Sequence, residues 1–154
     1  IWSTVRLALR PTEGGPRYLG VVVVLGRAPC DHALVRAQVW QTLDGCGTRI
    51  YGMPFTEEPP ATMWQLSFAM GEAEARAMPR DGASLKAEAL RRCACWHAPI
   101  GDLLRATAAE DITGYPAYDR PELSGIRERI AEGGAQEAGG DDDNDGGGGG
   151  GGGG

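Results

Sequence analysis

Cysteine and histidine, the usual ligands of structural zinc, are closely spaced at Cys93, Cys95 and His97. Structural zinc needs four converging nitrogen or sulfur ligands, and this run supplies three at most. The further candidates, Cys30 and His32, lie in a distant loop. We therefore expect no metal site, and we interpret the four cysteines of the chain as reduced, buried or incidental thiols.

The same run could also form a cysteine nucleophile with a neighbouring base. Cys93 and His97 are four residues apart, about one helical turn, so the imidazole could reach the thiol. Catalysis of this type also needs a group that orients the base and donors that stabilise an oxyanion. The sequence supplies neither, and we expect both residues to be structural.

Two glycine-rich strings could suggest a phosphate-binding loop. Gly45-Cys46-Gly47 begins like a dinucleotide fingerprint, but Ile50 stands where the third glycine belongs. This string also lies in a predicted hairpin turn and not between a strand and a helix. The run Gly146 to Gly154 follows no predicted strand. Neither string can hold a pyrophosphate at the start of a helix.

Apolar and aromatic side chains alternate along two predicted strands. One set is Tyr51, Met53 and Phe55, and the other is Trp64, Leu66, Phe68 and Met70. Such faces either pack against helices or line an apolar ligand pocket, and the sequence leaves both interpretations open.

Short strands must position these residues. Residues 18–25 are nearly all apolar and predict a central strand, which the segment 26–31 should break. Residues 35–43, 48–55 and 62–70 predict three further strands joined by short turns, and hence an antiparallel meander. Within the first of these three, Val39, Gln41 and Leu43 share one face, and Trp40 and Thr42 the other.

Helices are predicted around this sheet. Residues 1–10, 72–78, 84–96 and 100–109 have helical spacing, and residues 113–120 should return as an extended segment. A sheet followed by helices and a returning strand indicates the α+β class, an antiparallel sheet backed by two or three helices.

Composition separates the carboxy-terminal segment from the rest. The chain has 154 residues and a net charge of −6, of which Asp141, Asp142, Asp143 and Asp145 supply four negative charges. Residues 132–154 are acidic and glycine-rich, so we expect a disordered tail.

The dispersed arginines predict no nucleic-acid partner, and no apolar run is long enough for a transmembrane segment. With no signal or transit peptide at the start, we expect a soluble intracellular protein.

Several strings in order resemble one family, the single-component FAD-dependent aromatic-ring monooxygenases with the aromatic-hydroxylase fold. Residues 1–6 resemble the second half of its Asp-Gly motif, D-G-x-x-S-x-V-R, with Ser3, Val5 and Arg6 on the S, V and R positions. The strands and helices of the family's substrate domain are similar to residues 18–26, 41–45, 53–55, 63–68, 85–93, 96–97 and 114–120. The resemblance covers residues 1–123.

The resemblance implies the cofactors FAD and NAD(P)H. In this family FAD takes a hydride from NAD(P)H and then, with O2, delivers one oxygen atom to an organic, often aromatic, substrate. Ser3 and Arg6 inherit a nucleotide-binding role. Arg120 has two interpretations, a position near the flavin or the nicotinamide and a surface ion pair with Asp119. The faces with Met53, Phe55, Trp64 and Leu66 become candidate walls of the substrate pocket.

Two motifs of the family have no counterpart in this sequence. The amino-terminal G-x-G-x-x-G unit is missing, and so is the Gly-Asp motif expected soon after Arg120. We therefore expect a remnant of the FAD domain at 1–17, a substrate-domain-like part at 18–123 and a tail at 124–154. Such a chain should be an incomplete monooxygenase, inactive without the flanking FAD-domain segments. A non-enzymatic module that binds a small ligand and an inert remnant are the alternatives.

Overall fold

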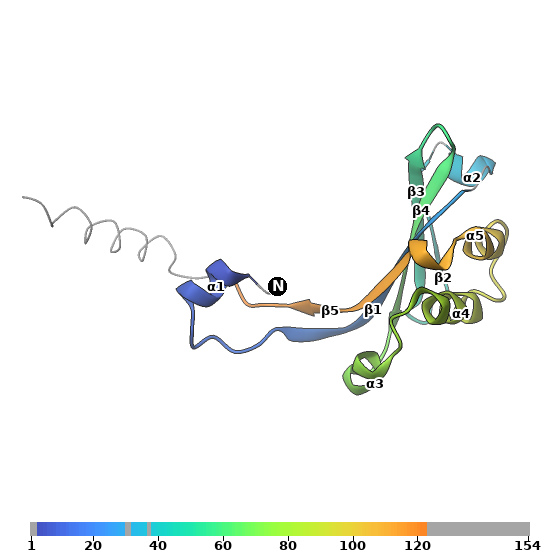
Figure 1. The fold of residues 1–154 in the computed structure, drawn as a ribbon. Helices are drawn as coiled ribbons and strands as arrows, with labels where there is room; N and C mark the ends of the chain where they lie inside the picture. The colour runs from blue at the N-terminus through green and yellow to red at the C-terminus, as the bar shows by residue number, and fades with distance from the viewer. Residues whose placement is uncertain (1–2, 30–31, 37, 123–154) are drawn as a thin grey trace, which may run out of the picture. The chain divides into compact units, whose positions relative to one another are not determined.

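The computed structural model describes residues 3–29, 32–36 and 38–122. A short helix comes first, then strands and helices alternate in groups (Figure 1). In chain order the elements are α1 (Thr4–Leu9), β1 (Arg17–Ala28), α2 (Ala33–Arg36), β2 (Trp40–Leu43), β3 (Arg49–Thr56), β4 (Ala61–Ala69), α3 (Glu72–Ala77), α4 (Gly82–Arg92), α5 (Ile100–Ala106), a 3-10 turn η1 (Ala109–Asp111) and β5 (Ile112–Asp119).

The five strands form one antiparallel sheet in the order β2-β3-β4-β1-β5. The meander expected from the sequence is confirmed as β2-β3-β4, and the returning segment is confirmed as β5, which pairs with β1. The α+β class is therefore confirmed. Beyond the last β1–β4 pair, Val21 and Ala69, the strands β1 and β5 continue alone as a two-stranded ribbon to Arg17 and Asp119.

The helices α3, α4 and α5 lie on one side of the sheet (Figure 1). Alternate residues of β1 and β4 point to that side and are fully buried, among them Val22, Val24 and Leu66. Leu85 of α4 and Leu103 of α5 are also fully buried and belong to the same apolar core. The core thus lies between one face of the sheet and the helices, the arrangement that the hydrophobic effect favours for an α+β domain.

Tryptophan and glycine alternate along one row of this buried face. Trp40 pairs with Gly52, Gly52 with Trp64, and Trp64 with Gly26 on the next strand. A Cβ atom added to Gly26 would lie 2.3 Å from the Trp64 ring, and one added to Gly52 would lie 2.6 Å from the Trp40 ring. Each indole therefore occupies the space that a side chain would need on its neighbour. The Trp64 Nε1–H donates to Thr107 Oγ1 at 2.9 Å, which joins the row to the end of α5.

Two of the expected strand boundaries are wrong. Residues 33–36 form the short helix α2, so β2 begins only at Trp40 and not at Val35. Val35 is fully buried, as an apolar residue of either structure can be, which explains why the apolar pattern was misleading. The break expected at 26–31 is also wrong at its start, because β1 continues to Ala28. Gly26 accommodates Trp64 and does not interrupt the strand.

The helix ends are set by side-chain hydrogen bonds that spacing alone did not reveal. α4 begins at Gly82 because Asp81 Oδ1 accepts from the Ser84 backbone N–H at 2.9 Å. α5 ends at Ala106, where Lys86 Nζ donates to the carbonyl oxygens of Arg105 and Thr107, both at 2.7 Å. The expected tail, including residues 132–154, and Cys30 lie outside the described residues.

No helix among the described residues is long and apolar enough to cross a membrane.

The contact between Gly26 and Trp64 predicts a clear effect of one methyl group. We expect Gly26→Ala to lower the free energy of unfolding by about 2 kcal/mol, because the new Cβ must displace the indole from a packed core. Chemical denaturation followed by tryptophan fluorescence measures this. Gly14→Ala is the matched control, since a Cβ there meets no atom within 4 Å. Equal stability of the two variants would show that the indole does not need the space above Gly26.

Candidate functional site

The sheet face turned away from α3, α4 and α5 is the first candidate surface. Directly paired residues of antiparallel strands share a face, and the pairs Tyr51–Gln65, Gln65–Leu25 and Met53–Met63 define this one. We call it the open face. Its residues include Val21, Val23, Leu25 and Arg27 of β1, Gln41 and Leu43 of β2, Arg49, Tyr51, Met53 and Phe55 of β3, Met63, Gln65, Ser67 and Ala69 of β4, and Thr113 and Tyr115 of β5.

The four residues expected to line a substrate pocket lie on two different faces. Met53 is partly buried and Phe55 is exposed, and both belong to the open face. Trp64 and Leu66 are fully buried against the helices. The sheet therefore separates the two pairs, and only Met53 and Phe55 can meet a ligand without unpacking the core.

The open face is largely apolar, with neutral polar groups near its centre and two arginines, Arg27 and Arg49. Leu43, Phe55 and Tyr115 are 61%, 54% and 49% exposed, which is unusual for side chains of this size. Gln65 lies between Tyr51 and Leu25 on neighbouring strands. Exposed apolar surface of this kind marks a place where another molecule or domain binds.

The second candidate site is a cluster of three charged side chains, Arg6, Glu13 and Arg120. Arg6 makes two hydrogen bonds to the Glu13 carboxylate, Nε–Oε2 at 2.6 Å and Nη2–Oε1 at 2.5 Å. Arg120 Nη1 donates to Oε2 of the same carboxylate at 2.9 Å. The three side chains come from α1, from the loop before β1, and from the residue after β5. We call them the arginine cluster.

The side chains of the arginine cluster are largely sheltered from solvent. The side chains of Arg6, Glu13 and Arg120 are 15%, 17% and 8% exposed, and two guanidinium groups share one carboxylate. The Nε–H of Arg120 is buried and has no hydrogen-bond partner. A buried donor without an acceptor is costly. The cluster is therefore suited to an additional anionic acceptor, such as a phosphate oxygen.

The three residues expected to bind the cofactors thus lie together at one end of the β1–β5 ribbon. Ser3 caps α1, because its Oγ accepts from the Arg6 backbone N–H at 3.2 Å. Ser3 therefore orients the helix that carries Arg6. Hydrogen bonding by Arg6 is the first cause that lowers the pKa of Glu13 to about 2, and hydrogen bonding by Arg120 adds to it. Glu13 is ionised at neutral pH and holds both arginines in place.

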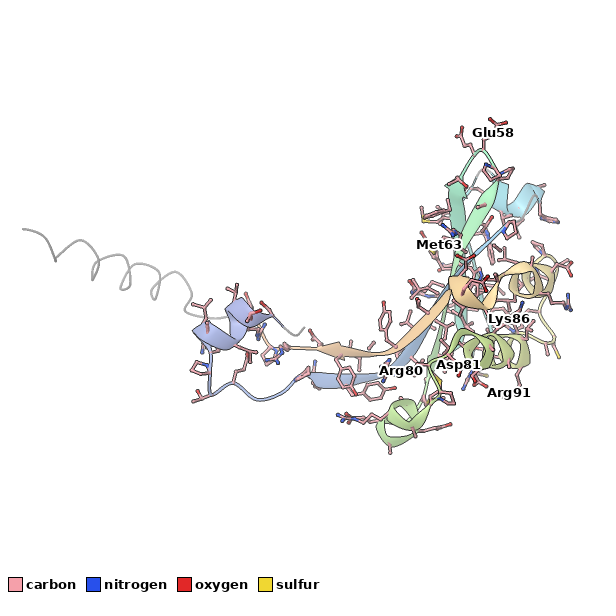
Figure 2. All side chains as sticks on the ribbon, in the orientation of Figure 1. Glu58, Met63, Arg80, Asp81, Lys86 and Arg91 are labelled. Atoms are coloured by element: carbon pink, nitrogen blue, oxygen red, sulfur yellow. The ribbon has the colours of Figure 1, made fainter. Side chains whose placement is uncertain are left out.

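A cavity of about 700 Å³ lies beside β5 and the loop before β1, and its lining does not include the three residues of the arginine cluster. Gly15 and Pro16 line it next to Gly14, whose carbonyl oxygen accepts from Arg120 Nη1 at 3.4 Å. Arg80 and Tyr118 line the other side (Arg80 is labelled in Figure 2). Its further lining residues are Arg76, Tyr115 and Pro116. The cavity combines aromatic rings with two guanidinium groups, and this favours a planar or anionic ligand.

The cysteines and histidine considered for metal or nucleophilic chemistry are not arranged for either. Burial raises the pKa of the Cys93 thiol to about 11, so the unreactive thiol form prevails. His97 Nε2 lies 2.9 Å from Thr42 Oγ1, and its Nδ1 lies 2.7 Å from the Ala98 carbonyl oxygen. His97 thus joins the loop between α4 and α5 to β2. Among residues 3–29, 32–36 and 38–122, no three His, Cys, Asp or Glu side chains could hold a metal ion.

Sequence reasoning did not identify Glu13 or Arg80. Glu13 contacts Arg120, which lies 107 positions further along the chain. Neither Glu13 nor Arg80 belongs to a repeating pattern in the sequence. Arg80 follows Pro79 in a loop between two helices. Only the pairing of β1 with β5 brings these segments together, and that pairing has no local signal in the sequence.

The ionisation of Glu13 predicts how the stability of the arginine cluster depends on pH. The folded state lowers the pKa of Glu13 from 4.5 to about 2, so the unfolded chain binds the extra proton between these two values. The stabilisation is therefore complete above about pH 4.5 and is lost as the pH falls toward 2. We expect the melting temperature of the native chain to exceed that of Glu13→Gln near neutral pH.

This difference should shrink steadily as the pH falls, and thermal unfolding followed by circular dichroism measures it. Other carboxylates with lowered pKa values, such as Asp81 and Glu88, are the same in both proteins and cancel. A difference that does not depend on pH would contradict the proposed role of Glu13.

The separation of the two faces predicts a large loss of stability for one apolar truncation and a small loss for another. We expect Leu66→Ala to lower the free energy of unfolding by about 3 kcal/mol, because Leu66 is fully buried. Met53→Ala, on the open face, should cost less than about 1 kcal/mol. Urea titration compares both with the native chain. If Met53→Ala were as costly as Leu66→Ala, the open face would be part of the core and could not receive a ligand.

No protein-family model and no curated protein matches this sequence. Solved structures do match. One is 2,6-dihydroxypyridine-3-hydroxylase from Arthrobacter nicotinovorans, with a TM-score of 0.61, 16% identity and coverage of 78% of this chain. Another is HpxO from Klebsiella pneumoniae in complex with FAD and uric acid, with a TM-score of 0.59, 23% identity and 72% coverage. PqsL from Pseudomonas aeruginosa in complex with 2-aminobenzoylacetate matches with a TM-score of 0.50, 21% identity and 75% coverage.

The chain spans only 36%, 28% and 30% of the length of these three structures. At these identities the likeness concerns the fold. It agrees with the resemblance found in the sequence, and it applies to most of the described residues. The fold of this chain is similar to that of a part of solved structures that include a hydroxylase and FAD-containing monooxygenases.

Proposed function

We propose that this chain is the substrate-covering part of an FAD-dependent monooxygenase that hydroxylates an apolar, usually aromatic, organic molecule. In this proposal the open face lies over the substrate, and the arginine cluster faces the nucleotide cofactors. The fold shared with known monooxygenases supports the general activity. The particular roles of the residues rest on the two surfaces described above.

The observation that carries the proposal is the difference between the two faces of the sheet. One face is packed against helices, while the other exposes Leu43, Phe55 and Tyr115. A sheet of a free-standing domain normally covers such apolar surface. The open face therefore fits a role in which a substrate and a further protein segment complete it.

The open face would bind the substrate mainly through apolar contacts and exclude water from it. Val23, Leu25 and Met63 supply apolar area, while Gln65 and Ser67 supply hydrogen-bonding groups between them. A few polar groups within an apolar surface orient a small ligand and give specificity. The organic ligands named for the neighbours, uric acid for HpxO and 2-aminobenzoylacetate for PqsL, belong to those proteins and illustrate the size of molecule that this fold accommodates.

The arginine cluster has the chemistry to hold a cofactor phosphate. Arg120 has a buried Nε–H without an acceptor, and a guanidinium group can donate charge-assisted hydrogen bonds to a phosphate. FAD would supply the redox chemistry, with NAD(P)H as the reductant. In this scheme Arg120 and Arg6 bind phosphate oxygens, Ser3 fixes the helix that carries Arg6, and Glu13 keeps both guanidinium groups in position.

We further propose that the 154-residue chain does not catalyse the reaction alone. The chain spans about a third of the length of the solved monooxygenases it matches, and no G-x-G-x-x-G unit precedes its sheet in the sequence. Substrate, reductant and the flanking nucleotide-binding segments would all be partners of this part. NADH and NADPH both fit the chemistry of the cluster.

The test compares the 154-residue chain with a longer protein that supplies the missing nucleotide-binding segments from the surrounding reading frame. We expect the short chain to retain no flavin after gel filtration with FAD. The longer protein should keep the yellow flavin spectrum and oxidise NAD(P)H faster when an aromatic substrate is present. Absorbance near the flavin and nicotinamide bands measures both. A longer protein that binds no flavin would contradict the monooxygenase proposal.

Variants of the longer protein separate the two surfaces. Arg120→Gln should weaken FAD or NAD(P)H binding about tenfold through loss of a charge-assisted hydrogen bond. Arg17→Gln is the control, because Arg17 lies on the same ribbon but its side chain is 77% exposed. Equal binding by both variants would remove the arginine cluster from the cofactor site while leaving the role of the open face intact.

A further inference from the structure

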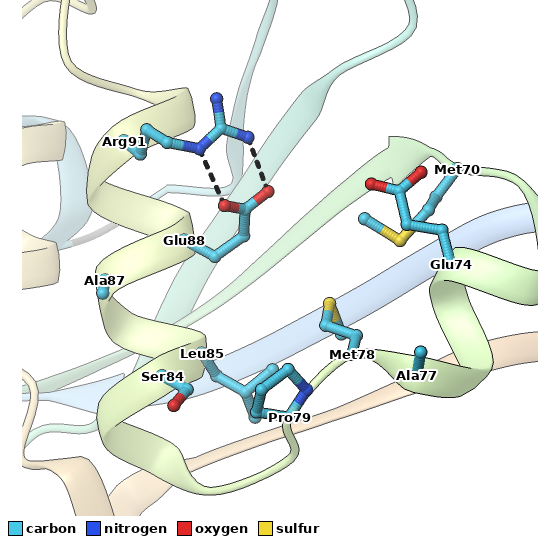
Figure 3. A pocket seen from close by; sticks show the side chains of 10 residues that line it. All are labelled: Met70, Glu74, Ala77, Met78, Pro79, Ser84, Leu85, Ala87, Glu88 and Arg91. Atoms are coloured by element: carbon cyan, nitrogen blue, oxygen red, sulfur yellow. Dashed lines mark hydrogen bonds and ion pairs between the residues drawn. The ribbon is translucent and has the colours of Figure 1, made fainter.

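A groove of about 570 Å³ lies between α3 and α4, on the helix-covered side of the sheet (Figure 3). Its floor is apolar and includes Met70, Met78 and Leu85. Leu85 belongs to the buried core, so the groove lies on the opposite side of the sheet from the open face. The volume lies within the range of small-molecule sites in proteins. The function proposed above makes no use of this groove.

Carboxylates come from both walls of the groove. Glu74 projects from α3 and Glu88 from α4, on opposite sides of the opening (Figure 3). Both oxygens of Glu88 are occupied, because Arg91 donates to them at 2.8 and 2.7 Å and Arg92 donates to Oε1 at 2.7 Å. The Glu74 carboxylate has no hydrogen bond or ion pair within the described part of the chain. The only charge on the rim without a partner is therefore negative.

The electric field in the groove agrees with this assignment. Arg91 is held by Glu88, whose hydrogen bonds are the main cause of its raised pKa, and Glu74 adds to the same shift from across the groove. The guanidinium of Arg91 is thus committed to Glu88. An anionic ligand in the groove would be repelled by the Glu74 carboxylate, whereas a cationic ligand would form an ion pair with it.

The apolar floor of the groove can accommodate ligands whose apolar groups differ in shape. Methionine side chains are flexible and polarisable, and they contact aromatic rings favourably. Two of the four methionines of the chain, Met70 and Met78, lie here. An aromatic or alkyl group could lie against their thioethers and Leu85, with a positively charged group directed to Glu74.

We propose that the groove between α3 and α4 is a second ligand site, and that it takes a small apolar molecule with a protonated amine. The ammonium group donates hydrogen bonds to the Glu74 carboxylate, and the apolar body covers Met70, Met78 and Leu85. The ligand bridges α3 and α4, which the loop at Pro79 and Arg80 connects. It therefore binds the folded state and stabilises it by mass action.

The four methionines provide a direct test on the full 154-residue chain. Met70 and Met78 lie in the groove, whereas Met53 and Met63 lie on the open face and act as internal controls. The chain is labelled with 13C at the methionine methyl groups, and each signal is assigned by a Met→Leu variant. It is then titrated with 2-phenylethylamine and, separately, with the uncharged analogue 2-phenylethanol.

We expect the amine to shift the methyl signals of Met70 and Met78, and the alcohol to do so several-fold more weakly. Glu74→Gln should weaken amine binding about fivefold, the effect of a partly exposed ion pair. Glu57→Gln removes the same charge from the exposed turn between β3 and β4 and should leave the affinity unchanged. Raised salt concentration should weaken the amine and not the alcohol.

Three results would overturn this site: no shift of Met70 and Met78, equal affinity for amine and alcohol, or no effect of Glu74→Gln. Shifts confined to Met53 and Met63 would also exclude the groove, and they would place the ligand on the open face. This outcome would leave the proposed monooxygenase role untouched. Conversely, a longer protein that binds no flavin would leave the groove site standing.

Discussion

The row Trp40–Gly52–Trp64–Gly26 is the constraint on which the rest of the structure depends. Each indole needs the empty space above a glycine of the adjacent strand, and this requirement fixes the register of four strands at once. The hydrogen bond from Trp64 to Thr107 then attaches α5 to the row. A one-residue slip of β2 or β4 would move a tryptophan to the other face of the sheet, and a slip of β1 or β3 would remove the glycine that the indole needs.

The same row explains why the two faces of the sheet serve different purposes. Both indoles point to the helix side. The residues next to Gly52 and Trp64 along their strands, such as Tyr51 and Gln65, therefore point to the other side. That side therefore receives medium-sized side chains with few charges, which neither form a closed core nor repel an organic molecule. The structural role of one face and the binding role proposed for the other both depend on a single alternation along β3 and β4.

Much of the sheet could be predicted from the sequence because alternation within a strand is a local signal. It identified β3 and β4 with nearly correct ends, and the sets Tyr51–Met53–Phe55 and Trp64–Leu66–Phe68 do share a face each. Which face is buried could not be predicted, because both sets are apolar. The short helix α2 was missed because four residues are too few for helical periodicity. The contact of Glu13 with Arg120 depends on the pairing of β1 with β5, which no local pattern encodes.

The arginine cluster is connected to the sheet by the β1–β5 ribbon, which no third strand supports beyond Val21. Where the ribbon begins, its register shifts between Tyr18 and Val22, and Gly20 adopts a φ of 77°. Tyr18 stabilises this point, since its hydroxyl donates to the Met70 carbonyl oxygen at 3.0 Å and its ring packs against Tyr118. The ribbon therefore has one irregular point, at Gly20, between the sheet and α1. We expect a force applied at α1 to bend the ribbon at this point first and to leave the packing of the tryptophans unchanged.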